Sequence, residues 1–212
     1  MTPTGPTPVP QADKDAAGKI RENAEARYAS IRGNGTYNAS AMQVALAKVY
    51  LDASTKMNAL QETSRANTAS KRRAVVAAAW GIDDIAGTNP VDRAAASMSF
   101  RDAVSRAADL DKQSELNAAL AQAESNGDEL AARAIAQRAY DLGYIDTVQT
   151  YVDPRPKAGA AIVQLMELDR EDRRGVQVTD LWAFALPKPS ELASLADYQI
   201  KDLATSPLAG KV

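Results

Sequence analysis

Carboxylates are the side chains of this sequence that come nearest to a catalytic arrangement. Asp83 and Asp84 are adjacent, and Asp169, Glu171 and Asp172 form a second group. Two carboxylates can share acid–base work only where burial separates their pKa values, so that one is protonated while the other is charged. Both groups lie at helix ends or in polar runs, which favours solvated surface positions over a catalytic pair.

The composition excludes most other kinds of catalytic side chain. The chain has no histidine and no cysteine, so it lacks the commonest general base and transition-metal ligand as well as a thiolate nucleophile. The run GNGT at 33–36 has neither the lysine nor the preceding strand of a phosphate-binding loop. We therefore predict a protein that is not an enzyme, with no catalytic residue, no cofactor and no metal ion.

The strongest cluster of positive charge is the run SKRRAVV, which follows Arg65 on the same predicted helix. Arg65, Lys71, Arg72 and Arg73 are of the type that contacts the phosphate backbone of nucleic acid without reading its sequence. One tryptophan two turns on is the only flanking aromatic side chain that could stack on a base. We keep these four residues as possible DNA-facing positions, with a solvated helix face or an intersubunit ion pair as the alternatives.

The run LWAFALP at 181–187 concentrates apolar and aromatic side chains in a segment that reads as extended. Strand-like alternation would place Trp182 and Phe184 on one side. A single strand cannot satisfy its own backbone groups, so it must cover the helices of its own chain or add to a neighbouring protein. We select Leu181, Trp182, Phe184 and Leu186 as candidate protein-interaction residues, and the intramolecular alternative stays open.

Helices must position all of these residues. Alanine, the best helix former, supplies about a fifth of the chain, while only 5% of the residues are aromatic. Leucine, arginine, glutamine and glutamate add to the same preference. The fold class that we predict is all-α.

Start and stop signals divide the chain into four parts. Residues 1–11 carry four prolines and are expected to form an extended arm. Residues 12–80 are expected to form a long helical hairpin that turns at a glycine pair. Residues 90–174 are expected to form a small helical bundle, and residues 175–212 an extended segment followed by a short helix over 190–204.

Capping residues locate the helices of the expected bundle. Asn89 and Pro90 can begin one helix, because asparagine caps well and proline suits the first helical position. Asp128 can begin another, and Gly143 can end it in the left-handed conformation. The expected helices span about 90–110, 111–125, 128–142, 144–152 and 157–174.

One stretch within this bundle resembles a tetratricopeptide unit. The run AYDLGYIDTVQTYVDPRP has that family's small–aromatic pair, its glycine at the turn and its final Asp-Pro. Its second helix has room for only about nine residues, and no second copy follows at a period of 34 residues. A peptide-binding adaptor of tetratricopeptide type therefore stays an alternative function.

A longer stretch, about residues 98–186 from FRDAVSRAADLDKQ to the proline-rich ALPKP, resembles helical proteins encoded among the virion structural genes of tailed phages that infect actinobacteria. The resemblance implies a structural protein, most specifically a head–tail connector subunit that assembles as a ring. Capsid accessory and scaffold or assembly chaperone are the alternatives.

The same resemblance implies the partners and the location. The partners would be copies of the chain, neighbouring portal, capsid or tail proteins, and packaged DNA through non-specific contacts. The location would be the virion, assembled in the cytoplasm of the bacterial host. The sequence contains no run of about 18 apolar residues, and the first residues, MTPTGPTPVPQ, have no basic or apolar signal region. We therefore expect no membrane partner.

Overall fold

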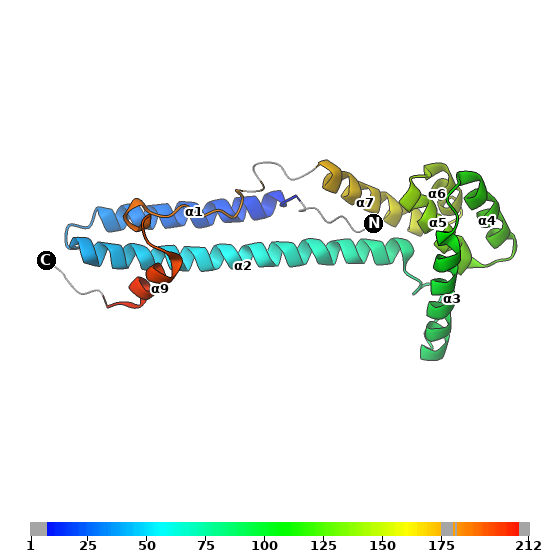
Figure 1. Cartoon of the computed structure of the whole chain (residues 1–212), viewed down its shortest axis with the longest axis horizontal. Helices are drawn as coiled ribbons and strands as arrows, with labels where there is room; N and C mark the ends of the chain where they lie inside the picture. The colour runs from blue at the N-terminus through cyan, green and yellow to red at the C-terminus, as the bar shows by residue number, and fades with distance from the viewer. Residues whose placement is uncertain (1–7, 175–179, 181, 208–212) are drawn as a thin grey trace. The chain divides into compact units, whose positions relative to one another are not determined.

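A computed structural model of the chain describes residues 8–174, 180 and 182–207. Every regular element in these residues is helical and none is a strand, so the expected all-α class is confirmed (Figure 1). The described residues form two compact units. We call residues 69–173 the central unit, and residues 8–68, 174, 180 and 182–207 the terminal unit. The boundary falls inside the long helix α2 (Ala39–Trp80).

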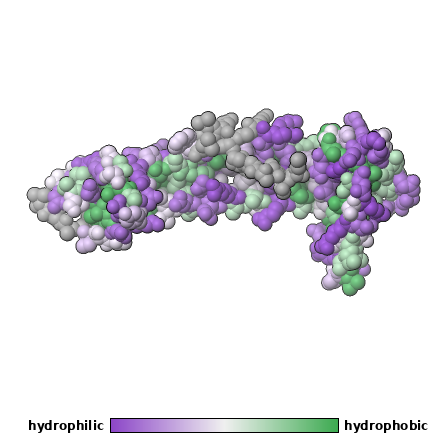
Figure 2. Space-filling view, viewed as in Figure 1, coloured by the Kyte–Doolittle hydropathy of each residue, from purple (hydrophilic) through white to green (hydrophobic). Residues whose placement is uncertain are grey.

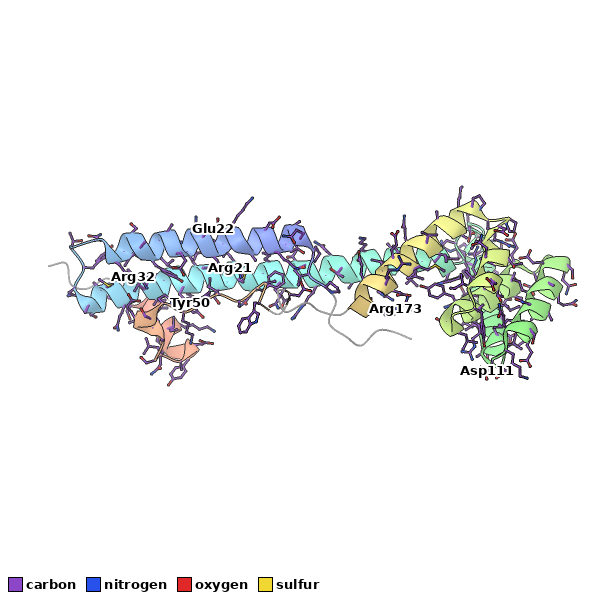
Figure 3. The ribbon with its side chains drawn as sticks, turned by 90° about the horizontal axis from the view of Figure 1, so that it is seen from above. Arg21, Glu22, Arg32, Tyr50, Asp111 and Arg173 are labelled. Carbon is purple, nitrogen blue, oxygen red and sulfur yellow. The ribbon has the colours of Figure 1, made fainter. Side chains whose placement is uncertain are left out.

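Two helices form the frame of the terminal unit. Helix α1 (Gln11–Arg32) and the first part of α2 lie side by side and run in opposite directions (Figures 1 and 3). Asn38 begins α2, because its side-chain oxygen accepts a hydrogen bond of 2.8 Å from the backbone N–H of Ala41. Near the other end of α1, the Ser64 hydroxyl donates a 2.5 Å hydrogen bond to Asp13. Ser64 is buried, although its stretch of the sequence reads as solvated.

The core of the terminal unit joins the two ends of the sequence. Tyr28 of α1 and Leu46 of α2 are fully buried together with Leu192 and Ile200 from the C-terminal part of the chain. Those two residues come from the 3₁₀ turn η1 (Ser190–Leu192) and from helix α9 (Asp197–Thr205). The single helix expected over 190–204 is therefore wrong. The interruption of helical structure between η1 and α9 lets both apolar side chains reach the core.

Helix α5 (Glu129–Leu142) is the centre of the central unit. It packs against α3 (Pro90–Ala108), α4 (Gln113–Ser125) and α6 (Ile145–Val152). Helix α7 (Pro156–Arg174) and the last turns of α2 complete the unit. Four alanines of α5 are buried, Ala132, Ala134, Ala136 and Ala139, which lets the neighbouring helices approach closely. The eight residues of α6 confirm that the second helix of the tetratricopeptide-like stretch is short.

The helix ends of the central unit lie where the capping residues predict them. The Asn89 side chain accepts a hydrogen bond of 2.9 Å from Val91 N–H, with Pro90 at the first helical position. At the start of α5, the Asp128 side chain accepts a hydrogen bond of 2.9 Å from Ala131 N–H. At the end of α5, Gly143 has a φ of 80°, a conformation that disfavours any residue with a Cβ atom.

Candidate interaction surfaces

The C-terminal segment, residues 180 and 182–192, is held on α1 by charged side chains. At its start, the ammonium group of Lys14 lies 2.5 Å from a carboxylate oxygen of Asp180, whose side chain is 2% exposed. At its end, Arg32 donates two hydrogen bonds, of 2.7 and 2.8 Å, to the carboxylate of Glu191. Charge-assisted hydrogen bonds are stronger than neutral ones, and the two bonds of the Arg32–Glu191 pair also fix the orientation of the segment at that point.

Arg21 fixes the backbone between these two pairs. Its guanidinium donates to the carbonyl oxygens of Trp182, Ala183 and Ala185 at 3.2, 3.2 and 3.3 Å. Residues 182–184 form a turn in place of the expected strand. The physical reason is that backbone hydrogen bonds close the turn, from Ala183 N–H to the Asp180 carbonyl at 3.3 Å and from Ala185 N–H to the Trp182 carbonyl at 3.1 Å, while Arg21 donates to the carbonyls on its side. We call Lys14, Arg21 and Arg32 with their partners the α1 clamp; Figure 3 labels Arg21 and Arg32.

The hydrogen bonds from Arg32 strongly favour the charged form of Glu191. They lower the pKa of the Glu191 carboxyl from 4.5 to about 2. The pair therefore stays ionised over the whole physiological range. It acts as a fixed attachment and does not act as a proton donor.

The selected residues of the C-terminal segment have different surroundings. The Trp182 side chain is 66% exposed, although the backbone beside it is fixed. Phe184 and Leu186 are partly buried, and Leu186 packs against the core of the terminal unit. Leu181 lies outside the described residues. The segment thus covers its own chain, as the intramolecular alternative has it, while one large aromatic ring is presented to solvent.

Sequence reasoning missed the cations of the α1 clamp, although their spacing contains a signal. Lys14, Arg21 and Arg32 are separated by 7 and 11 residues, and both separations return to the same face of an α-helix. Asp180 and Glu191 are 11 residues apart. The cations that pair with Asp180 and Glu191 are Lys14 and Arg32, which are 18 residues apart, so the two separations do not match and could not have suggested the pairing.

The basic cluster does not present a uniform cationic surface. Arg72 pairs with Asp169 at 2.6 Å and with Asp172 at 2.8 Å, and its side chain is 28% exposed. The Tyr140 hydroxyl donates to the same Asp169 at 2.5 Å, and burial, reinforced by that bond, raises the pKa of Tyr140. Arg72 therefore joins α2 to α7 inside the central unit and is not free for DNA.

The other three cations of the cluster are exposed. Arg65 belongs to the terminal unit, whereas Lys71 and Arg73 belong to the central unit. None of the three forms an ion pair with another described residue. They remain accessible to an anionic partner.

The adjacent carboxylates Asp83 and Asp84 have separate partners. Asp83 pairs with Arg93 on the surface at 2.7 Å. Asp84 accepts bonds of 2.6 and 2.7 Å from Arg133, whose side chain is only 6% exposed. The hydrogen bonds that Arg133 donates to Asp84 lower the pKa of the Asp84 carboxyl and raise the pKa of the Arg133 guanidinium. This is a permanent ion pair, which suits structural support and not proton transfer.

Arg133 also serves two neutral groups of the central unit. It donates to the Tyr151 hydroxyl at 3.0 Å and to the carbonyl of Gly81, the residue after α2. One guanidinium thus ties α5 to α6 and to the end of α2. Among the described residues, no group of three or more acidic side chains is placed to hold a metal ion.

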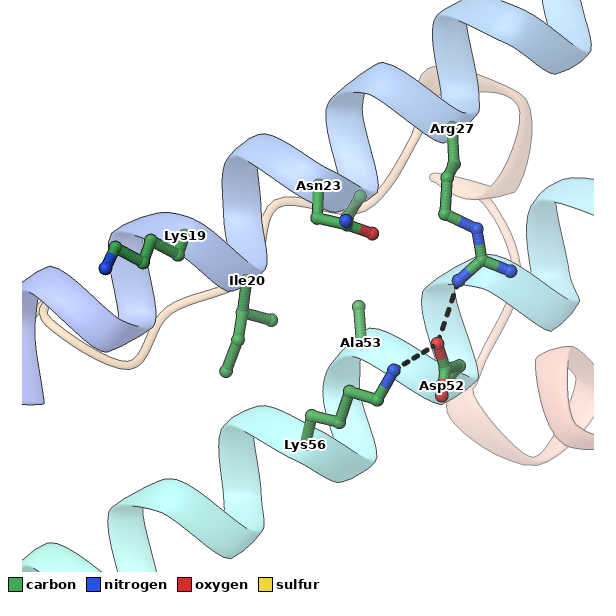
Figure 4. A pocket seen from close by; sticks show the side chains of 8 residues that line it. Lys19, Ile20, Asn23, Arg27, Asp52, Ala53 and Lys56 are labelled. Carbon is green, nitrogen blue, oxygen red and sulfur yellow. Dashed lines mark hydrogen bonds and ion pairs between the residues drawn. The ribbon is translucent and has the colours of Figure 1, made fainter.

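A shallow groove of about 240 Å³ lies between α1 and α2 in the terminal unit (Figure 4). Ile20, Ala24 and Ala53 contribute its apolar surface. Three cations and one carboxylate contribute its charge, and the carboxylate, Asp52, lies 2.9 Å from both Arg27 and Lys56. The groove is suited to contact with an anionic group of a partner, and it contains no pair of groups that could exchange a proton.

A second groove, of about 340 Å³, lies in the central unit. We call it the α3–α4 groove, because residues of α3 and α4 line it together with residues of α5. Five alanines, Leu110 and Ile135 form its apolar lining, and Arg106, Gln122, Asn126 and Asp128 are the polar residues around it. Its lining of short side chains leaves room for another element to approach.

Comparison of the chain with protein-family models, curated proteins and solved structures finds no match. Within the part of the chain that the structure describes, no helix combines the length and the apolar character needed to span a membrane.

Proposed function

We propose that this chain is a non-enzymatic structural protein that acts by binding copies of itself and neighbouring proteins of a particle. In its most specific form, the proposal is a head–tail connector subunit of a tailed phage, assembled as a ring in the bacterial cytoplasm and retained in the virion. The observation that carries the proposal is the exposed Trp182 on a segment whose backbone is fixed.

Trp182 has the properties of an anchor for a partner protein. Tryptophan is among the residues that contribute most to binding where an interface excludes water. Fixing the backbone in advance by Arg21 lowers the conformational entropy that the segment would lose on binding. If the Trp182 side chain only stabilised the fold of its own chain, its indole would be expected to lie against the core.

Two further features support the specific form. The resemblance over about residues 98–186 is to virion structural proteins, whose partners are portal, capsid and tail components. Contact with packaged DNA, in this proposal, falls to Arg65, Lys71 and Arg73, because Arg72 is already paired with two carboxylates.

The first test measures incorporation into particles. A connector is expected in purified mature virions at a fixed ratio to the portal protein, quantified by mass spectrometry. A chain that is present during assembly but absent from mature virions would be a scaffold. A chain absent from both would contradict the proposal.

The second test concerns Trp182. Trp182→Ala is expected to lower incorporation at least tenfold, because an aromatic anchor contributes about 2 kcal/mol or more. The melting temperature of the isolated chain should change little. Tyr198→Ala is the matched control, since Tyr198 is also an aromatic residue of the terminal unit and is 66% exposed. Equal losses for the two variants, or a large fall in the melting temperature with Trp182→Ala, would show that Trp182 is no anchor.

A further inference from the structure

The turn between α5 and α6 presents a surface that is both acidic and apolar. We call Asp141, Ile145 and Asp146 the acidic corner. Both aspartates are exposed, and neither forms an ion pair with another described residue. Ile145 is 49% exposed. Figure 2 shows apolar side chains scattered over a mostly hydrophilic surface of the central unit, and a partner of the corner has to meet both kinds of group.

No nearby cation balances the charge of the acidic corner. Residues 139–154 contain three aspartates and no lysine or arginine. The cations next to this stretch, and the one in the loop that Tyr144 contacts, are already paired with other carboxylates: Arg138 with Asp111, Arg155 with Glu124 and Lys112 with Glu115. The corner therefore carries an excess of negative charge.

The backbone of the acidic corner is fixed before any partner binds. The Tyr144 N–H donates to the Ala139 carbonyl at 2.8 Å, and the Tyr144 hydroxyl donates to the Asp111 carbonyl at 2.9 Å. Gly143 takes the left-handed conformation that ends α5 and turns the chain into α6. A surface that is already ordered loses little conformational entropy on binding.

The groove between α1 and α2, which we call the α1–α2 groove, has the opposite charge (Figure 4). Three cations line it against one carboxylate, which leaves an excess of two positive charges. Arg27 and Lys56 share the single carboxylate of Asp52, and Lys19 forms no ion pair with another described residue. The excess is therefore open to an outside anion. Ile20 and two buried alanines supply apolar surface beside these charges.

We propose that the acidic corner of one copy of the chain binds the α1–α2 groove of another copy. Ile145 would cover the apolar surface of the groove, and the two aspartates would meet its cations. The inference rests on the proposed self-assembly and specifies its contact. Opposite charges on two surfaces steer their encounter and disfavour other partners, and burial of an apolar side chain adds to the affinity.

A protein segment suits the α1–α2 groove better than nucleic acid does. Phosphate groups would meet the cations but would leave Ile20 and the alanines uncovered. The acidic corner offers both the carboxylates and the aliphatic side chain. The two surfaces are different patches of the same chain, so the contact is head-to-tail, and such a contact gives a closed ring when its rotation closes.

Two charge-reversal variants test the two surfaces separately. The corner variant is Asp141→Lys with Asp146→Lys, and the groove variant is Lys19→Glu with Lys56→Glu. All four side chains are exposed, so a folding defect is unexpected. Circular dichroism checks folding. If a double variant loses helix, Asp141→Lys or Lys19→Glu alone replaces it, since neither residue has an ion pair to lose.

The matched controls reverse the same number of exposed charges away from both surfaces. They are Glu62→Lys with Asp202→Lys for the corner variant, and Lys157→Glu with Lys201→Glu for the groove variant. These controls keep the net charge of each test variant, so a general effect of net charge on assembly would appear in both.

Sedimentation velocity and native mass spectrometry measure the result. Each test variant alone should need about tenfold more protein than the wild type to assemble, because it brings like charges together. Both controls should assemble as the wild type does. An equimolar mixture of the two test variants should regain wild-type assembly, because each reversed surface then meets a surface of opposite charge. Added salt should weaken wild-type assembly, since it screens exposed charges.

The outcomes separate this inference from the proposed function. If the wild type assembles and either test variant assembles equally well, the corner–groove contact is wrong and self-assembly stands. A mixture that assembles no better than each variant alone would also overturn the contact. A wild-type chain that is monomeric at every accessible concentration would overturn the proposed self-assembly itself, and this inference with it.

Discussion

At the scale of single residues, the pair of Asp84 and Arg133 has one member in water and one in the interior. The Asp84 side chain is 66% exposed, whereas that of Arg133 is 6% exposed. Loss of Asp84 would leave a buried cation, and an unpaired buried charge is far more costly than an unpaired exposed one. The two partners should therefore respond differently to substitution.

This asymmetry gives a prediction for stability. Asp84→Ala is expected to lower the free energy of unfolding by about 2–3 kcal/mol, since it removes two charge-assisted hydrogen bonds from Arg133. Adding Arg133→Met should restore part of that loss, because no buried cation then remains. Urea unfolding of both single variants and the double variant measures the coupling. A double variant less stable than Asp84→Ala alone would contradict this account.

Glu191 gives a prediction for pH. Its pKa is about 2 in the folded chain against an ordinary value of 4.5, so its pair with Arg32 stabilises the fold above pH 4.5 and ceases to do so as the pH falls toward 2. The Arg32 side chain is 39% exposed, so solvent screening limits the contribution to about 1 kcal/mol or less.

The measurement is the difference in unfolding free energy between the wild type and Glu191→Gln. We expect the wild type to be more stable at pH 6, and the difference to shrink as the pH falls below 4.5. When both chains also carry Arg32→Gln, the difference between them should no longer depend on pH. A difference that stays constant from pH 6 to pH 3 would show that the pair does not hold the segment.

At the scale of elements, the C-terminal segment shows what a sequence pattern can and cannot indicate. Its aromatic and apolar composition indicates that the segment packs against other residues, and Leu186 packs against the core of the terminal unit. The strand-like alternation does not identify its conformation, because that conformation depends on turn hydrogen bonds within the segment and on Arg21, which is 161 residues away from Trp182 in sequence. The same limit applies to Arg72, whose carboxylate partners lie 97 and 100 residues further on.

The α1 clamp gives a prediction for this element. Arg21→Gln should release the carbonyls of Trp182, Ala183 and Ala185 and speed limited chymotrypsin cleavage after Trp182 and Phe184 several-fold. Lys19→Gln is the control, since Lys19 is also a cation of α1 and forms no ion pair with another described residue. Cleavage at the same rate in the wild type and in Arg21→Gln would show that the guanidinium does not hold the backbone.

At the scale of the whole molecule, local signals predict the helices, whereas contacts between residues distant in sequence determine how the helices group into two units. Asn89, Asp128 and Gly143 predict helix ends because capping and left-handed turns depend on a few adjacent residues. The division inside α2 has no such signal, since no proline or glycine interrupts that helix. The exposure of residues 91–95 at the start of α3 also escapes prediction, because their composition does not differ from that of a buried alanine-rich helix.

The α1 clamp has a consequence for variation and for engineering. Arg21 binds carbonyl oxygens, which every amino acid possesses, and makes no hydrogen bond to the side chain of Trp182. The residue presented there can therefore be exchanged while the segment keeps its attachment. Binding preference can therefore diverge between related chains at position 182, or be redesigned there, without a matching change in the residues of the α1 clamp.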